Sequence, residues 1–181
     1  KSEQELIYLD SIFDAVTRTT GESELLEIRE ELTEQGYLKN YRNKNKMLRP
    51  LPPLQYRSSD GFTILCGRNN RQNDKLTLKT AHNYDLWLHT QRIAGSHVIV
   101  VADGKEIPNR TIEEAAVIAA CNSAAGTGAG GAAGAKVPVD YTYVKNVKKP
   151  AGARPGMVVY DPYQTAMVPV DHRRAEALRE R

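Results

Sequence analysis

The chain has 181 residues, of which 40% are hydrophobic and 26% charged, and its formal net charge is +3 at pH 7. These values are typical of one globular domain with an accessory segment, and they exclude extended disorder, a collagen-like repeat and a disulfide scaffold. No run approaches the roughly 18 apolar residues of a membrane-spanning helix, so we expect no membrane association. We expect the two cysteines, Cys66 and Cys121, to be reduced and packed as small apolar side chains, which favours a cytoplasmic location.

The basic charge is concentrated in the middle of the sequence. Residues 1–55 carry eight basic and ten acidic side chains, residues 56–160 carry thirteen and eight, and residues 161–181 carry four of each. A local basic excess can attract a polyanion such as a nucleic acid, although an ordinary solvated surface explains the same charges.

Because the chain starts without Met, we expect it to be a segment of a longer protein, and its first residues lack the apolar core of a signal peptide.

Residues 1–49 predict a short helical hairpin, which is typical of the end of a coiled-coil arm. Apolar residues recur at helical spacing over 4–18 and again over 22–35. Gly36 follows the second pattern at the position where a glycine commonly ends a helix. The hairpin is therefore expected to consist of two antiparallel helices joined by a tight turn.

A basic run and a proline-rich segment separate this hairpin from the rest of the chain. The run extends from Lys39 to Arg49, and residues 50–53 are Pro-Leu-Pro-Pro. Because proline cannot continue a helix and favours extended backbone, we place a linker and a domain boundary at 50–53.

Beyond the linker the apolar period changes from that of a helix to that of a strand. Two helices are the exceptions: a short one capped by Asn73 or Asp74, and one that opens at Thr111 with Glu114 completing a capping box. Few helices among hairpin-connected strands imply an α+β fold with a mixed, mainly antiparallel sheet over 54–170. The expected strands span 54–57, 62–66, 85–89, 97–101, 137–147, 157–160 and 166–170, and a charged helix or tail is expected over 171–181.

The segment 124–135 is rich in glycine and alanine, with Gly126, Gly128 and Gly131 at the G-x-G-x-x-G spacing. A dinucleotide site needs a strand before this motif and a helix after it, so that the helix N-terminus meets the pyrophosphate. Here a helix precedes and a strand follows, and Lys136 does not fit a Walker loop. We therefore expect a flexible linker.

The polar loop over 67–74 is a candidate nucleic-acid contact. Arg68 and Arg71 could clamp phosphate oxygens beside the backbone amides of a helix start. Asn69 and Asn70 could hydrogen-bond the edges of bases. The structural alternative is a capped turn with exposed arginines.

A second candidate cluster contains Trp87, His89 and His97, which lie at the ends of two predicted strands. These rings could stack on bases or contact phosphate, and the alternative is a core tryptophan with ordinary polar strand ends. As metal ligands the histidines lack a third partner, and Ser96 beside His97 lacks a predictable orienting acid. We expect no catalytic residue, metal or cofactor.

A third group of basic residues surrounds a turn that contains proline and glycine. Such a turn suits contact with a phosphate backbone, and it suits solubility equally. The group comprises Lys145, Lys148, Lys149 and Arg154.

Short motifs follow one another in a characteristic order through the second domain. They are S-S-D-G-F (58–62), G-R-N-N-R-Q-N-D (67–74), L-T-L-K (76–79), W-L-H-T (87–90), G-S-H-V (95–98), V-P-V-D-Y-T (137–142) and K-K-P-x-G-A-x-P-G-M-V (148–158). Together they resemble the NFACT-R domain of the RqcH/NEMF proteins, whose bacterial members are often called fibronectin-binding protein A. The resemblance covers about 54–170, and residues 1–49 resemble the distal end of that family's coiled-coil arm.

The resemblance implies an RNA-binding module, not an enzyme, that acts in ribosome-associated quality control in the cytoplasm. Its implied partners are the large ribosomal subunit carrying a stalled peptidyl-tRNA, with its rRNA, and the tRNA recruited for C-terminal alanine tailing. The alternative function is a protein-interaction or adhesin module that binds host fibronectin. The residues expected to contact RNA are Arg68, Asn69, Asn70, Arg71, Lys75, Lys79, His89, His97 and Lys149.

Overall fold

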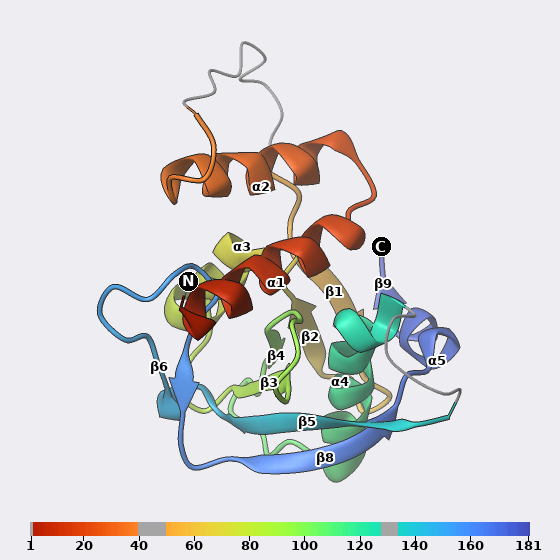
Figure 1. The fold of residues 1–181 in the computed structure, drawn as a ribbon. Coiled ribbons are helices and arrows are strands. Elements are labelled where there is room, and N and C mark those ends of the chain that lie inside the picture. The colour runs from red at the N-terminus through yellow and green to blue at the C-terminus, as the bar shows by residue number, and fades with distance from the viewer. Residues whose placement is uncertain (1, 40–49, 128–133) are drawn as a thin grey trace.

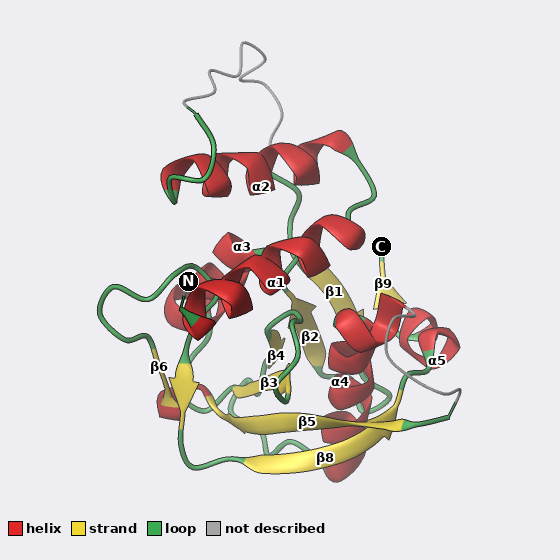
Figure 2. Cartoon of the chain, viewed as in Figure 1, coloured by secondary structure: helices red, strands yellow, loops and turns green. Residues whose placement is uncertain are grey.

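The computed structural model (Figure 1) describes three stretches of the chain: residues 2–39, 50–127 and 134–181. Two stacked helices lie above the sheet in that view, and further helices pack around it (Figure 2). The predicted basic run, apart from Lys39, and residues 128–133 of the glycine-rich segment lie outside the described residues. No helix within the three stretches is long and apolar enough to span a bilayer.

The N-terminal hairpin consists of helices α1 (Glu3–Thr17) and α2 (Glu22–Glu34). Ser2 caps the first helix, because its hydroxyl oxygen accepts a hydrogen bond from the backbone N–H of Glu5. Figure 1 shows α2 running back above α1, so the predicted hairpin is confirmed. Its small core comprises Tyr8, Ile12, Ala15 and Ile28.

The described residues contain nine strands, which form two antiparallel sheets. Their bounds are β1 (Leu54–Arg57), β2 (Thr63–Cys66), β3 (Leu86–Thr90), β4 (Val98–Val100), β5 (Lys136–Tyr143), β6 (Val147–Lys148), β7 (Val159–Tyr160), β8 (Gln164–Pro169) and β9 (Arg179–Glu180). Seven strands join in the order β8-β5-β3-β4-β2-β1-β9, and β6 pairs with β7 alone. Because every pairing between them is antiparallel, the expected α+β fold with a mainly antiparallel sheet is confirmed.

One face of the large sheet packs against helix α4 (Asn109–Cys121). Successive strand residues point to opposite faces, so Leu86 and Leu88 face α4 while Trp87 faces away from it. The alanine-rich helix lies close to the sheet, because its small side chains allow the helix backbone to approach the strands. This layer forms the main hydrophobic core.

The opposite face of the sheet is covered by several short elements. Trp87 and Ile99 pack there with Leu76, the first residue of the π-helical turn Leu76–Thr80. Tyr160 of β7 packs on the same cluster. This face therefore holds the candidate aromatic cluster, with the turn and the small sheet as its cover.

The start of α4 differs from the predicted one. The helix begins at Asn109, and the side chains of Thr111 and Glu114 do not form a capping box. The Thr111 hydroxyl donates to Ser58 Oγ at 2.9 Å, and the Glu114 carboxylate accepts from the backbone N–H of Ser59 at 2.9 Å. Both side chains instead fix the turn between β1 and β2, so the capping-box prediction is wrong.

The C-terminal part also departs from the expected strand lengths. Strand β5 ends at Tyr143, because residues Val144–Asn146 turn into a 3-10 helix whose Lys145 N–H donates to the Asn83 carbonyl at 3.1 Å. Near the terminus, helix α5 (His172–Ala177) leads into β9, which pairs with β1 through Arg179 opposite Tyr56. The charged segment over 171–181 thus contains a helix followed by an edge strand.

Candidate nucleic-acid interface

The loop over 67–74 becomes helical earlier than its sequence suggested. Asn69 has an extended backbone and its side chain accepts a hydrogen bond from the Gln72 N–H at 2.9 Å, so it caps helix α3 (Asn70–Lys75). The predicted cap Asn73 is occupied elsewhere, because its Oδ1 accepts from the backbone N–H of His97 at 3.1 Å. The prediction that Asn73 or Asp74 caps this helix is therefore wrong.

The carboxylates of α2 face this loop. They recur every three or four residues, which places them on one side of the helix. Arg71 lies 2.6 Å from Glu34 and 3.3 Å from Glu30. The Asn69 amide donates to Glu27 at 2.8 Å. Opposite charges from two distant segments thus bind the hairpin to the loop.

Arg68 anchors the linker as well as the hairpin. Its Nε donates to the carbonyl of Pro52 at 2.7 Å, and its guanidinium lies 3.5 Å from Glu24. Beside it, the Gln72 side-chain amide donates to the carbonyl of Leu51 at 2.6 Å. The arginine predicted to clamp phosphate therefore holds the linker in place.

Asn70 lies at the centre of this contact and is only 4% exposed. Its Nδ2 donates to Ser11 Oγ at 2.9 Å and to Glu31 Oε2 at 3.1 Å. Burial raises the pKa of the Glu31 carboxyl, while hydrogen bonds from Tyr8 and Asn70 act in the opposite direction. In this arrangement the four loop residues predicted to meet RNA all contact the hairpin, and the Arg71 side chain remains 31% exposed.

His97 is equally enclosed, at 1% exposure. Its Nε2 lies 3.1 Å from the Gly156 carbonyl, which can only accept, and its Nδ1 lies 2.8 Å from the Thr77 hydroxyl. The neutral ring with a proton on Nε2 satisfies both partners. Burial is the main reason that the pKa of His97 falls to about 3, so the ring is uncharged at neutral pH.

His89 stacks on the ring of Trp87, with centroids 5.8 Å apart and planes inclined by 8°. Burial also lowers the pKa of His89. Tyr160 and His97 pack against the same indole, which is fully buried. The cluster forms an aromatic core of uncharged rings, and Trp87 is covered rather than open for stacking on a base.

The turn that follows β6 is held firmly by its basic residues. Lys149 Nζ lies 3.2 Å from Asp74 and donates to the carbonyls of Arg154 at 2.7 Å and Met157 at 3.2 Å. The Arg154 guanidinium lies above the ring of Tyr8, 5.3 Å from its centroid. Lys149 therefore connects this turn to α3, and Arg154 connects it to the hairpin.

Other basic residues of the prediction are open to solvent. Lys145 Nζ lies 4.9 Å from the ring centroid of Tyr84 and 5.9 Å from that of Tyr143. The two rings meet edge to face at 5.7 Å and are 62% and 45% exposed. We call the following group of exposed residues the lysine–tyrosine surface: Lys75, Lys79, Tyr84, Tyr143, Lys145 and Lys148.

The two tyrosines were missed at the sequence level. They are far apart in the chain, and the pairing of Leu86 with Tyr143 brings the start of β3 beside the end of β5. Two further bonds join the same segments: the backbone N–H of Lys145 donates to the Asn83 carbonyl at 3.1 Å, and that of Val144 to the Asp85 carbonyl at 2.9 Å. A signal was present in Tyr141, Tyr143 and Lys145, which recur at every second position, but their partner Tyr84 could be found only from strand register.

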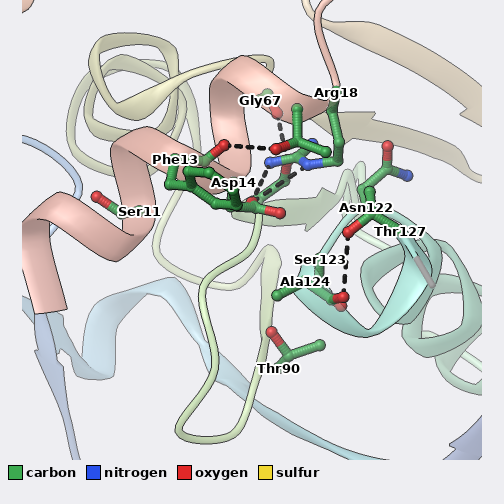
Figure 3. Close-up of polar contacts among 12 residues, drawn as sticks. Ser11, Phe13, Asp14, Arg18, Gly67, Thr90, Asn122, Ser123, Ala124 and Thr127 are labelled. Atoms are coloured by element: carbon green, nitrogen blue, oxygen red, sulfur yellow. Dashed lines mark hydrogen bonds and ion pairs between the residues drawn. The ribbon is translucent and has the colours of Figure 1, made fainter. Parts of the chain in front are cut away.

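Ser96 and the two cysteines are buried within the fold. Ser96 Oγ donates to the Gly67 carbonyl and accepts from Arg18, which also pairs with Asp14 at 2.7 Å (Figure 3). Burial raises the pKa of the Cys66 thiol, and that of Cys121 to about 11. Among the described residues, no three His, Cys, Asp or Glu side chains are grouped to hold a metal ion.

Comparisons with known proteins identify relatives of this chain. A relative from Bacillus subtilis (strain 168), Rqc2 homolog RqcH, is 42% identical over 173 residues, which is 94% of this chain and 29% of that protein. The Rqc2 homolog RqcH of Streptococcus pneumoniae (strain D39) is 36% identical over 177 residues, or 97% of this chain and 30% of that protein. The chain therefore spans about three-tenths of the length of these curated relatives.

A solved structure shares the fold. It is the C-terminal part of the fibronectin/fibrinogen-binding protein from Streptococcus suis, with a TM-score of 0.87 and 34% identity over 98% of this chain and 68% of that chain. The family model described as NFACT protein RNA binding domain matches residues 53–161, which include α3, the aromatic cluster and the lysine–tyrosine surface. The chain therefore belongs to the NFACT protein RNA binding domain family.

Proposed function

We propose that this chain is the RNA-binding module of a ribosome-associated quality control factor and that the lysine–tyrosine surface is its RNA contact. In this proposal the module works in the cytoplasm by binding and not by catalysis. It contacts rRNA or tRNA on a large ribosomal subunit that carries a stalled peptidyl-tRNA. It thereby supports recruitment of tRNA for C-terminal alanine tailing.

The single observation that carries the proposal is the exposed Lys145 ammonium between the rings of Tyr84 and Tyr143. Bases stack on aromatic rings and phosphates attract lysines, so alternating tyrosine and lysine suits a single-stranded segment of RNA. None of the four lysines of this surface forms an ion pair with a carboxylate in the described part of the chain.

Neighbouring carboxylates do not neutralise this surface. Asp74 pairs with Lys149, and Asp85 accepts hydrogen bonds from the backbone N–H groups of His82 and Ala102. Both acids are therefore occupied within the fold. The positive charge of the surface is left available to a polyanion.

The proposal revises the expected set of contact residues. Lys75 and Lys79 stay in it because both are exposed. The other expected residues leave it, because each is engaged within the fold by hydrogen bonds, ion pairs or ring stacking. They are Arg68, Asn69, Asn70, Arg71, His89, His97 and Lys149.

The test is the salt dependence of binding to a labelled single-stranded RNA. Each lysine that meets a phosphate should contribute about 0.7 to the slope of log affinity against log salt, so Lys79→Gln and Lys145→Gln should each flatten that slope. Tyr84→Ala should lower affinity by about 1–3 kcal/mol at unchanged slope. Lys105→Gln, an exposed lysine elsewhere, is the matched control. Equal effects of Lys105→Gln and Lys145→Gln would contradict the proposed surface.

Cosedimentation addresses the ribosomal part of the proposal. Large subunits carrying peptidyl-tRNA are mixed with the wild-type chain and with the same lysine variants. The Lys79→Gln and Lys145→Gln chains should be depleted from the subunit fraction, whereas Lys105→Gln should not. RNA binding without any association with subunits would retain the RNA contact and overturn the ribosomal assignment.

Fibronectin binding is the second candidate, because the similar Streptococcus suis protein is named as a fibronectin/fibrinogen-binding protein. A basic surface also binds acidic proteins without specificity. Titration of fibronectin at high salt, with a competing polyanion, separates the two cases. Undiminished fibronectin affinity under both conditions would support a specific protein interaction.

A further inference from the structure

A cavity of about 790 Å³ lies between α1 and the face of the sheet that carries Trp87. Helix α1 supplies one wall with Glu3, Ile7, Asp10 and Asp14, which recur at the three- and four-residue spacing of one helix face. The aromatic cluster and residues 156–158 supply much of the rest. A volume of this size is typical of ligand-binding clefts. We call this space the α1 cavity.

The α1 cavity has an apolar interior that the fold leaves open. Phe13 is 74% exposed and Ile7 is 51% exposed, although both line the cavity. Met157 and Val158 line it too and are partly buried. Exposed apolar side chains that gather in a hollow are characteristic of binding surfaces.

The charge of the cavity is mainly negative. Of the described residues, the carboxylates Glu3 and Asp10 line it together with the basic Arg92, and a third carboxylate, Asp14, is paired with Arg18. Glu3 and Asp10 form no ion pair with a described basic residue. The two histidines in its floor are uncharged at neutral pH, because burial lowers the pKa of each.

Asp14 adds a second and independent observation. It is 4% exposed, and although Arg18 binds its Oδ2 at 2.7 Å, its Oδ1 has no hydrogen-bond partner in the described structure. Figure 3 shows the Asp14 carboxylate turned toward Arg18, and Asp14 and Ala124 both line the cavity. A buried carboxylate oxygen without a donor is costly, and a ligand that donates a hydrogen bond would relieve that cost.

We propose that the α1 cavity binds an extended protein segment that presents a lysine or arginine beside a large apolar side chain. The cation would lie near Asp10 and Asp14, and the apolar side chain would pack on Ile7 and Phe13. Charge argues against a strand of nucleic acid, because its phosphates would meet Glu3 and Asp10. This site does not depend on the RNA contact proposed above.

The chain carries its own reporter for this site. Trp87 is the only tryptophan, and it lies in the floor of the cavity, so its fluorescence should respond to an occupant. A displayed library of random dodecapeptides is selected on the folded wild-type chain and depleted on a Glu3→Lys/Asp10→Lys/Phe13→Ala variant. The enriched peptides should share a basic residue next to an aromatic or large aliphatic residue.

Titrating an enriched peptide against the Trp87 signal decides the matter. The triple variant should bind it roughly tenfold or more weakly, and a Glu106→Lys/Leu25→Ala control, which changes exposed residues outside the cavity, should bind as wild type does. Circular dichroism verifies that all three chains are folded. Enrichment of no peptide, equal binding by the triple variant, or a Trp87 response to AMP or oligoadenylate instead of the peptide would overturn the proposal.

Discussion

Asn70 Nδ2 lies 3.1 Å from Glu31 Oε2, and this bond joins the first residue of α3 to the last turn of α2. The same carboxylate oxygen accepts the hydroxyl of Tyr8, so one buried acid ties together both hairpin helices and the sheet domain. Such a shared acceptor orders all three elements at once. The hairpin is therefore packed on the sheet domain as part of one structure. Asn70, which the sequence suggested as an RNA contact, is one of the residues that hold it there.

Asn70→Ala should destabilise the chain. The change removes two donated hydrogen bonds and leaves Glu31 and Ser11 with fewer partners in a buried place, at a cost of about 2 kcal/mol. Urea denaturation measures the loss. Lys75→Ala, at the exposed end of α3, is the control and should change stability by less than about 0.5 kcal/mol. Equal losses in both variants would show that the Asn70 contacts contribute little.

His97 makes the stability depend on pH. Its pKa is about 3 in the fold and 6.5 ordinarily, so in that window the unfolded chain binds a proton that the folded chain does not. The free energy of unfolding should therefore fall as pH decreases below about 6.5, by at most about 1.4 kcal/mol per pH unit for this one group. The lowered pKa of His89 has the same sign.

The comparison of wild type with His97→Gln isolates this effect, since Asp14 and Glu31 have raised pKa values and oppose it. Urea midpoints are measured from about pH 5 to about pH 7, and the variant should lose less stability on acidification. If the variant does not fold, an NMR titration of the wild-type imidazole takes its place. A midpoint near the ordinary value of 6.5 for His97 would refute the prediction.

The fold was accessible from the sequence because periodicity reports burial. The alternation at Leu86, Trp87 and Leu88 indicates which strand side chains are buried on each face of the sheet, and the helical spacing over α1 does the same for the hairpin. The sheet and the hairpin could therefore be predicted from these two patterns. Helix starts were less accessible. Asn69, Asn73 and Asp74 are all plausible caps, and the choice depends on the distant N–H of His97, which occupies Asn73.

The candidate site was predicted less well, because its contacts join residues far apart in the chain. Asn69 meets Glu27 across 42 positions and Asn70 meets Ser11 across 59. In the sequence, the α2 carboxylates resemble an ordinary solvated helix face. Only their complementarity to Arg68 and Arg71 hinted that the hairpin would cover the loop.

The two thiols should be unreactive in the folded chain. Cys66 is fully buried and Cys121 nearly so, and burial raises the pKa of each, that of Cys121 to about 11, which suppresses the reactive thiolate. Iodoacetamide followed by mass spectrometry should show no modification under native conditions and two modified residues in denaturant. Rapid labelling of either residue in the native state would show that the core between α4 and the sheet opens readily.

Gly156→Ala should cost more stability than Gly152→Ala. Both glycines have a left-handed backbone, with φ of 81° and 76°, so each substitution adds about 1 kcal/mol of backbone strain. A methyl at 156 would also lie 2.5 Å from Asn70 Oδ1, whereas a methyl at 152 meets nothing within 4 Å. The first variant should therefore lose at least about 1 kcal/mol more.

Urea denaturation of the two glycine variants under the same conditions separates the cost of backbone strain, which both share, from the cost of the contact with Asn70, which only Gly156→Ala makes. Because the Gly156 carbonyl also accepts from His97, displacement of this turn should disturb the aromatic core, and the Trp87 emission of Gly156→Ala should shift while that of Gly152→Ala should not. Equal stabilities and unchanged emission would mean that Asn70 can retreat from the turn at little cost. The close approach of the turn to Asn70 would then not hold the hairpin, which would depend on the shared Glu31 acceptor and on the pairs that Arg68 and Arg71 form with α2.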